Sequence, residues 1–147
     1  MTNAPIKRTG MVDSLSANEF AVEIDGERAT GIFKVSGFAS FKLEVKPAIT
    51  RMMTDTFKIA KMVQRDPNLP FNRWARETIA AKDDINRPKR TLAIIAVDDG
   101  NEIRRWTING AWISEIAYSD FDTGSGELVQ ETLTIQYESI TETWAAS

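Results

Sequence analysis

The sequence predicts a mainly β, antiparallel domain with one main α-helix. Several runs of residues alternate apolar and polar side chains with a period of two, which is typical of half-buried strands. A single segment after Asp66 carries apolar residues at helical spacing instead. Turn signals, of which Asp98-Asp99-Gly100-Asn101 is the strongest, separate the alternating runs. This combination favours a sheet structure with one packed helix.

The chain length suits one domain preceded by an arm. The 147 residues, 42% of them apolar, are enough to bury a core of their own. We expect residues 19–147 to form that domain. Residues 1–18 contain Lys7 and Arg8 but no apolar run after them, so they are not a signal peptide. We expect them to be a flexible arm.

The composition excludes several classes of function. The chain has no cysteine and no histidine, which removes disulfides, thiol nucleophiles, histidine-based triads and histidine-ligated zinc. The net charge of -3 does not indicate that the chain as a whole binds nucleic acid. No apolar run is long enough to span a membrane, so we expect no membrane anchor and synthesis in the cytoplasm. No cofactor and no metal is expected.

The first half of the domain reads as strands and one irregular loop. Residues 20–24 alternate and end at an Asp25-Gly26 turn. Residues 32–45 form a second β-rich run, and we expect Gly37 to bend it from one sheet to another. Residues 46–56, KPAITRMMTDT, show no clean period and predict a loop. Residues 56–64 are extended.

The helix is expected to follow residues 66–70. Asp66 or Asn68 can cap it, and a proline suits its first turn. Its polar face, which includes Asn72, should lie in water. Its apolar face consists of Phe71, Trp74, Ala75, Thr78 and Ala81. We expect this face to cover a sheet or close the end of a barrel.

The second half of the domain predicts a hairpin and a closing strand. Residues 91–97 are almost wholly apolar, and residues 103–108 form the partner strand across the Asp98–Asn101 turn. Asn109-Gly110 marks either a second turn or a bulge. Residues 112–118 continue the β pattern, residues 119–126 form a loop, and residues 126–138 form the last strand.

The last strand, GELVQETLTIQYE, has one apolar face and one polar face. Val129, Leu133, Ile135 and Tyr137 share a parity that also contains a carboxylate, Glu131. Because a lone buried charge is costly, Glu131 should lie at a strand edge or be paired. The opposite parity carries Gln130, Thr132, Thr134 and Gln136. A polar face of this kind suits another strand or a water-filled channel.

Three further clusters carry candidate chemistry. Residues 120–127, DFDTGSGE, resemble a calcium loop, but glycine is not at the required sixth position, so a surface loop is favoured. Asp98, Asp99, Asp120 and Asp122 could serve a carboxylate-dependent enzyme, although the first two fit a solvated turn better. The basic residues near Arg87 have no glycine-rich phosphate cradle beside them, so they favour a solvated face or a protein contact.

The order of these segments resembles the tail-tube proteins of contractile-tailed phages and extracellular contractile injection systems. The resemblance covers roughly residues 20–141. It rests on FAVEIDG followed by FKVSGF, the tryptophan-bearing helix, RPKRTLAIIAVDDGNEIRRWTINGAW, and the closing DFDTGSGELVQETLTIQYESI. Each motif is short, and it is their ordered set that identifies the family. Two departures are the extra Gly110 in the Asn-Ala-Trp step and the missing glycine after the third strand.

The resemblance implies an Hcp-like fold and a structural role. In such proteins two packed antiparallel sheets form a small β-barrel or sandwich flanked by a helix. Six copies join edge strands into a ring, and rings stack into a rigid tube inside a contractile sheath. The lumen passes DNA or an effector protein. The implied partners are other copies, the sheath, and the baseplate or initiator and terminator proteins. The implied location is the virion tail or injection-system particle, and the implied enzymatic activity is none.

This family role suggests which residues meet other copies. Between copies or rings we expect contacts from Lys46, Arg51, Met52, Met53, Asp55, Arg87, Lys89, Arg90 and Glu131. Arg87, Lys89 or Arg90 of a neighbour is the expected partner of Glu131. Toward the lumen we expect Gln130, Thr132, Thr134 and Gln136. A baseplate or tube-initiator ring of the same fold is an alternative, suggested by the irregular loop at residues 46–56.

Overall fold

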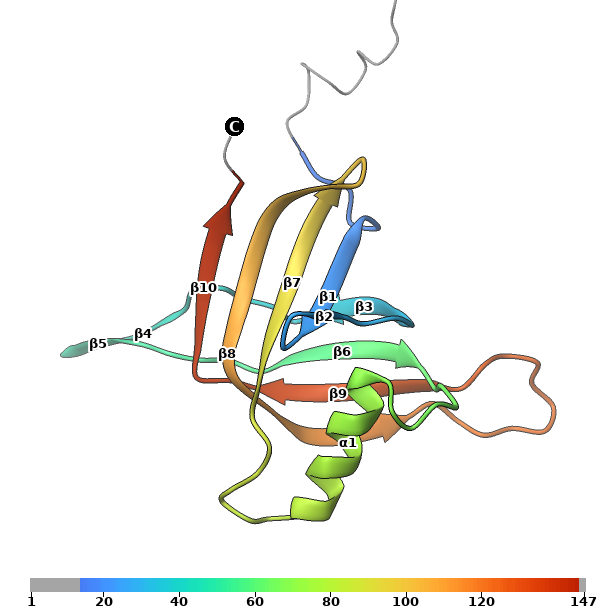
Figure 1. Ribbon diagram of the computed structural model, residues 1–147. Helices are drawn as coiled ribbons and strands as arrows, with labels where there is room; N and C mark the ends of the chain where they lie inside the picture. Colours follow the sequence, from blue (N-terminus) through green and yellow to red (C-terminus); the bar gives the residue numbers. More distant parts are fainter. Residues whose placement is uncertain (1–13, 146–147) are drawn as a thin grey trace, which may run out of the picture.

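The computed structural model describes residues 14–145 and confirms a mainly β chain with one helix (Figure 1). Residues 1–13 of the expected arm lie outside the described part. The elements in chain order are β1 (Phe20–Ile24), β2 (Glu27–Arg28), β3 (Ile32–Ser36), β4 (Leu43–Lys46), β5 (Ile49–Met52), β6 (Phe57–Met62), α1 (Pro70–Ala81), β7 (Arg90–Asp98), β8 (Asn101–Tyr118), β9 (Gln130–Gln136) and β10 (Ser139–Trp144).

Two antiparallel sheets share the long strand β8. The five-stranded sheet has the order β2-β1-β7-β8-β10, in which β8 contributes residues 101–111. The four-stranded sheet has the order β8-β9-β6-β3, in which β8 contributes residues 112–118. No pairing joins β3 back to β1 or β2 among the described residues. The fold is therefore a sandwich rather than a closed barrel (Figure 1).

The bend in β8 is a β-bulge at Asn109-Gly110, which settles the open choice between turn and bulge. Opposite β7, two residues of β8 lie against the single residue Thr91, because the pairing shifts between Leu92–Ile108 and Arg90–Ala111. Gly110 has a φ of 64°, the left-handed value that glycine adopts at such bulges. An extra residue bends a strand and increases its twist. This bulge takes β8 from one sheet into the other.

Replacing Gly110 by alanine should lower the free energy of unfolding by about 1–2 kcal/mol, because a side chain at this φ is strained. An added Cβ would also meet the Glu138 carboxyl carbon at 2.4 Å. Urea denaturation at a fixed protein concentration measures the loss. In a Glu138→Ala background the clash is gone but the strain remains, so the loss should persist. Gly110→Ala with wild-type stability would contradict the assigned strain.

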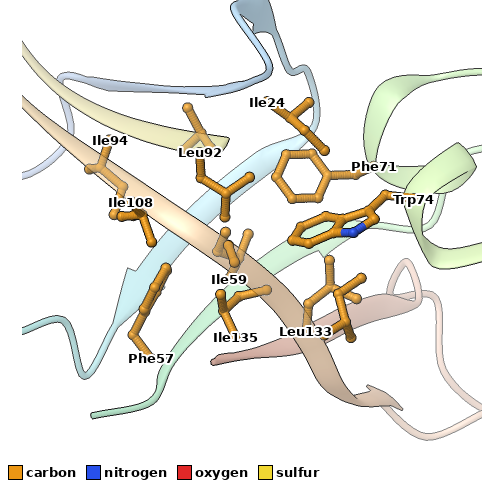
Figure 2. Packing of buried hydrophobic residues seen from close by; sticks show 13 residues of the cluster. Ile24, Phe57, Ile59, Phe71, Trp74, Leu92, Ile94, Ile108, Leu133 and Ile135 are labelled. Atoms are coloured by element: carbon orange, nitrogen blue, oxygen red, sulfur yellow. The ribbon is translucent and has the colours of Figure 1, made fainter. Parts of the chain in front are cut away.

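The core lies between the two sheets and is closed at one end by α1. Phe71 and Trp74 of the helix enter the space between Leu92 of the five-stranded sheet and Ile59 and Leu133 of the four-stranded sheet (Figure 2). All five side chains are buried. The Trp74 indole Nε1 donates to the Pro88 carbonyl at 2.9 Å, so its polar atom is satisfied as well. The predicted apolar face of the helix is confirmed by this packing.

Several local predictions are corrected by the structure. Residues 46–56 are not an irregular loop: β4 and β5 pair there as a two-stranded hairpin. Leu69, rather than Asp66 or Asn68, occupies the N-cap position, and no side chain caps the helix, although Pro70 stands in its first turn as expected. The strands β2 and β10 were not anticipated. Strand β10 pairs with β8 through residues 139–144 and extends the five-stranded sheet.

Candidate assembly surfaces

Glu131 is the buried carboxylate of the last strand, and its partner is Lys61 of its own chain. The Lys61 ammonium donates to Glu131 Oε1 at 2.8 Å, to Asn72 Oδ1 at 3.1 Å and to the Met62 carbonyl at 3.1 Å, which uses its three protons. Both side chains are buried, at 1% exposure for Lys61 and 9% for Glu131. The prediction that Glu131 is paired is therefore confirmed. The expectation that it pairs with Arg87, Lys89 or Arg90 of a neighbouring copy is wrong, because Lys61 supplies the charge.

This cluster ties the helix to the four-stranded sheet. Asn72 belongs to α1 and was expected to face water, whereas it accepts from Lys61 and donates to the Asp66 carbonyl. Tyr118 donates its hydroxyl to Glu131 Oε2 at 3.3 Å from the end of β8. Burial raises the pKa of Tyr118, and the negative charge of Glu131 adds to the effect. Sequence reasoning missed Lys61, although its parity with Phe57 and Ile59 was a visible signal.

The outer face of the four-stranded sheet is mostly polar, although Met62 and Trp112 also lie on it. Gln130, Thr132, Thr134 and Gln136 point away from the core, since their neighbours Glu131, Leu133 and Ile135 are buried. The same face carries Lys34, Lys58, Ser114, Glu115 and Ala117 from the other three strands. Thr134 Oγ1 donates to Glu115 at 3.3 Å, and Gln136 Nε2 donates to Ser114 Oγ at 3.0 Å. These side chains are half-buried or exposed, so the face remains open to water.

The four-stranded sheet also has two free edges. Within residues 14–145, β3 pairs only with β6, and residues 112–118 of β8 pair only with β9. The unpaired N–H and C=O groups of an edge can bond to a strand of another chain. The four strands alternate in direction, so β3 and this part of β8 run antiparallel to each other across the sheet. An edge β3 of one copy could thus pair with β8 of a second copy in antiparallel fashion.

The β4–β5 hairpin projects from one end of this sheet (Figure 1). Direct partners across a hairpin share a face, so Leu43, Val45 and Met52 form an apolar face with Thr50. Glu44, Lys46 and Arg51 form the charged face, which also carries Ile49 opposite Lys46. Val45 is 72% exposed and Met52 63% exposed. A two-stranded hairpin is marginally stable alone, and this one displays its apolar face to solvent.

Salt bridges within the hairpin hold its charged face together. Glu44 accepts from Arg51 at 2.6 Å and lies 3.5 Å from the Lys46 ammonium. At the base, Lys42 donates to Asp55 at 2.9 Å, and this hydrogen bond lowers the pKa of Asp55. Met53 lies beside the base and is half-buried. The expected contact residues at positions 46 to 55 therefore belong to one ordered projection.

The loop between β8 and β9, residues 119–129, projects from the opposite end of the sheet (Figure 1). It encloses a hollow of about 450 Å³. Phe121 and Leu128 on its wall are exposed by 79% and 72%. Asp120, Asp122 and Glu127 also line it, and the loop has no basic residue.

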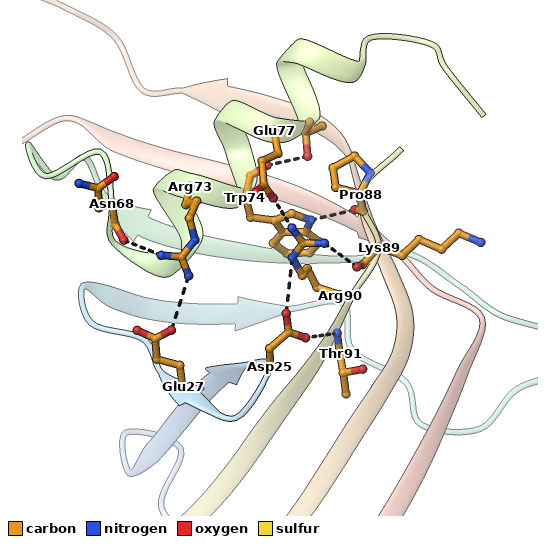
Figure 3. A network of polar contacts seen from close by, with 11 residues as sticks. Asp25, Glu27, Asn68, Arg73, Trp74, Glu77, Pro88, Lys89, Arg90 and Thr91 are labelled. Atoms are coloured by element: carbon orange, nitrogen blue, oxygen red, sulfur yellow. Dashed lines mark hydrogen bonds and ion pairs between the residues drawn. The ribbon is translucent and has the colours of Figure 1, made fainter. Parts of the chain in front are cut away.

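The expected basic contact residues are engaged within the chain. Arg90 pairs with Glu77 of α1, lies 3.5 Å from Asp25, and donates to the Lys89 carbonyl (Figure 3). Lys89 pairs with Glu138 at 2.6 Å, at about half exposure for both side chains. Arg87 lies over the Trp112 ring, 4.1 Å from its centroid. Arg90 thus joins α1 to the β1–β2 turn, whereas Lys89 and Arg87 remain near the surface.

The structure separates the four carboxylates of the enzyme alternative. Asp98 and Asp99 lie at the turn between β7 and β8, where Asp99 has a φ of 51°. Asp120 and Asp122 lie in the 119–129 loop, at a different corner of the molecule (Figure 1). Over residues 14–145, no three His, Cys, Asp or Glu side chains group closely enough to hold a metal ion. Within residues 14–145, no cluster of candidate ligands therefore supports the calcium interpretation of residues 120–127.

The described part of the chain contains no helix long and apolar enough to cross a membrane.

A family model agrees with the architecture. The model of the T4-like virus tail tube protein gp19 matches residues 48–141, well over half of the chain. A search of curated proteins gives no match.

Solved structures share the fold at low sequence identity. A chain of the sheath-tube complex of the extracellular contractile injection system PVC, in its extended state, is 13% identical with a TM-score of 0.69, covering 91% of this chain and 94% of that one. A chain of the tube terminating cap of the anti-feeding prophage is 15% identical with a TM-score of 0.71, covering 90% and 92%. Hcp1 from Flavobacterium johnsoniae is 12% identical with a TM-score of 0.56, covering 86% and 96%.

Proposed function

Because the chain belongs to the T4-like virus tail tube protein family, we propose that six copies close into a ring and that such rings stack into a rigid inner tube. The chain is a tail-tube, Hcp-like structural subunit of a contractile phage tail or injection system. This family and its structural neighbours are tube proteins rather than enzymes, which removes the carboxylate-dependent enzyme alternative.

The free edges of the four-stranded sheet are the observation that carries the ring proposal. If β3 of each copy pairs with residues 112–118 of the next β8, the four strands of every copy continue into one antiparallel barrel. Six copies would contribute about 24 strands, more than the 16 to 18 that already enclose an aqueous channel. Ring closure also removes the exposed edges, which would otherwise be sites of aggregation.

In this ring the polar face of the four-stranded sheet lines the lumen. Its uncharged hydroxyl and amide groups, among them Thr132, Thr134 and Gln136, stay hydrated and offer few apolar contacts to a passing molecule. Its charges are Lys34, Lys58 and Glu115, so each copy contributes two cations and one anion. We propose that DNA or an effector protein passes along it. The five-stranded sheet and α1 then face outward.

The proposed partners follow from the position in the particle. The PVC relative belongs to a sheath-tube complex, and further neighbours of similar fold come from the anti-feeding prophage cap and its baseplate. We propose that the chain likewise meets a sheath, a baseplate or initiator protein, and a terminator. The baseplate-initiator alternative drew on an irregular loop at residues 46–56. Since those residues form a regular hairpin, we favour the body of the tube.

A cysteine cross-linking experiment tests the ring, because the natural chain has no cysteine. One cysteine replaces Lys34 on β3, and a second replaces Ser114, Glu115 or Ala117 on β8. A bismaleimide that spans about 8 Å reaches a directly neighbouring strand, about 5 Å away, with a register offset of up to about two residues. It falls short of the about 14 Å that separate β3 from β8 within one chain. We expect a ladder of covalent oligomers that ends at the ring number. The matched control pairs Lys34→Cys with Thr143→Cys on β10 and should give no such ladder.

Negative-stain electron microscopy of the wild-type protein accompanies this test and should show rings or stacked tubes. Ladders missing from all three β8 positions, in protein that forms rings, would contradict the proposed edge pairing. A wild-type chain that stays monomeric at high concentration with its sheath and baseplate partners present would contradict the tube function itself.

A further inference from the structure

We propose that the contact between copies in a ring has one fixed register. In this register Lys34 of one copy forms an ion pair with Glu115 of the next, and Phe33 fills a hollow between helix α1 and strand β8 of that next copy. The proposal rests on the proposed ring of tube subunits and identifies which residues of the two free edges meet. Two independent features carry it, the charges of the edges and their apolar side chains.

The two free edges carry opposite charges that have no counter-charge within residues 14–145. Lys34 is the exposed cation of β3, and it lies on the polar outer face of the sheet without an ion pair in that part of the chain. Glu115 is the exposed carboxylate of the β8 edge on the same face, where it accepts a hydrogen bond from Thr134 but meets no cation in the described residues. Opposite charges directly across two strands stabilise their pairing. A neighbouring copy can therefore supply each charge with a partner.

The two edges also match in the apolar side chains of their other face, which points toward the core. Phe33 is the extra residue of a β-bulge in β3, is 41% exposed, and lines a small hollow with Phe20 and Ile94. It therefore lies on the core side of its edge. At the other edge, Ile79 of α1 and Ile116 of β8 line a hollow of about 370 Å³ on the same side. An aromatic side chain from a neighbouring copy would fill this hollow and remove apolar surface from water.

One antiparallel register satisfies both matches. When Lys34 lies opposite Glu115, the preceding residue Phe33 lies opposite the following residue Ile116. Direct cross-strand partners have Cβ atoms about 4.5–5.5 Å apart, which is close enough for both contacts. A register shifted by two residues would place Lys34 opposite Ala117, which carries no charge. The ion pair then faces the lumen, and the apolar contact lies in the outer layer of the ring.

This register also supplies an offset that a closed barrel needs. Within one chain, the pairings lead straight across the sheet from Lys34 through Ala60 and Thr132 to Ala117. The proposed partner of the next copy's Lys34 is Glu115, two residues away from Ala117 along β8. Each copy is therefore displaced along its strands by about 7 Å relative to its neighbour. A sheet closes into a barrel only when its strands are staggered and tilted in this way.

Exchanging the two charges tests the ion pair. Lys34→Glu and Glu115→Lys each place like charges opposite one another, so we expect each to raise the protein concentration at which half of the chains are in rings by about tenfold. The chain with both substitutions should return to within about twofold of wild type, because the pair is restored with its signs exchanged. The matched control Lys58→Glu is exposed on the same face but lies on the inner strand β6, and it should not change this concentration. Analytical ultracentrifugation measures the ring fraction, and circular dichroism checks that each variant is folded.

Disulfide formation tests the register itself. One variant carries Phe33→Cys with Ile116→Cys, and the other carries Val35→Cys with Ile116→Cys, while Lys34 and Glu115 stay in both. A disulfide needs Cβ atoms about 3.5–4.5 Å apart, which direct partners approach and partners offset by two residues do not. We therefore expect oxidation to link neighbouring copies through position 33 and not through position 35. Since β3 and β8 lie about 14 Å apart within one chain, any such disulfide joins two copies.

The outcomes distinguish this inference from the proposed function. Wild-type protein that forms neither rings nor tubes contradicts the tube function. Rings in which position 33 gives no link, or a folded double-exchange variant that assembles no better than the single variants, overturn the proposed register and leave the tube function standing.

Discussion

Replacing Glu131 by alanine should lower the free energy of unfolding by about 3–5 kcal/mol, because it leaves the Lys61 ammonium buried without its counter-charge. Two neutral acceptors, Asn72 Oδ1 and the Met62 carbonyl, would remain beside that ammonium. They hydrogen-bond to it but carry no compensating charge. Chemical denaturation at matched protein concentrations measures the effect, since assembly also contributes to apparent stability.

Two controls separate the buried charge from lost packing at the Glu131 site. The double variant Lys61→Met with Glu131→Leu removes both charges at similar volume, and it should be close to wild type or more stable. Lys89→Ala breaks a half-exposed pair with Glu138 and should change stability by less than about 1 kcal/mol. If Glu131→Ala unfolds like wild type, the pair does not hold the fold as described.

This result would also change the role of Glu131 in assembly. The pairing with a neighbouring copy that the sequence suggested implies that reversing the charge of Glu131 disturbs ring formation more than folding. Because its partner Lys61 belongs to the same chain, reversing the charge of Glu131 would bury two cations side by side. This would destabilise the subunit before any ring forms. We therefore expect Glu131 variants to fail as folded subunits, and ring loss to follow from that.

Replacing Trp74 by alanine should cost about 3–5 kcal/mol, the usual range for removing a large buried aromatic side chain. Trp74 is 1% exposed, packs against Phe71 with ring centroids 5.7 Å apart, and fills the end of the sandwich. Its loss opens a cavity between the helix and both sheets. Thermal and urea unfolding of the purified chain measure the cost.

Trp144 is the matched control for Trp74. It is 64% exposed on β10, with Arg104 stacked 3.3 Å from the ring centroid. Trp144→Ala should change stability by no more than about 1 kcal/mol, the size of a surface cation–π contact. Trp74→Phe should fall between the two, since it keeps most of the apolar volume but loses the hydrogen bond to Pro88. Equal losses of stability in Trp74→Ala and Trp144→Ala would contradict the conclusion that the helix closes one end of the core.

The features that sequence could predict are those that depend on local pattern. Alternation identified β1 and β9, and a nearly continuous apolar run identified β7. Helical spacing identified the face of α1, and Asp98–Asn101 identified the hairpin turn. The parity of residues 130–136 correctly divided the buried side chains from the polar outer ones. Each of these signals is set by the geometry of a single strand or helix, because neighbouring residues alone determine which side chains share a face.

The β4–β5 hairpin and the strand β10 could not be predicted from local sequence pattern. The apolar and polar faces of residues 43–52 become visible only when β4 and β5 are aligned across their turn. Both faces are exposed, so the sequence of each strand lacks the alternation that a buried face imposes. Strand β10 exists because the first part of β8 offers it an edge. Pairing partners decide both cases, and these partners are a matter of tertiary arrangement.

The sequence by itself determined the mainly β class, the single helix, the lack of histidine and cysteine chemistry, and the ordered motifs of a tail-tube family. Only the tertiary structure decided that Gly110 bends β8 into two sheets, that Lys61 neutralises Glu131, and that the hairpin and the acidic loop lie at opposite ends of one sheet. The physical reason is that these features join residues far apart in the chain. Lys61 and Glu131 are 70 residues apart, and only the pairing of β6 with β9 brings them together.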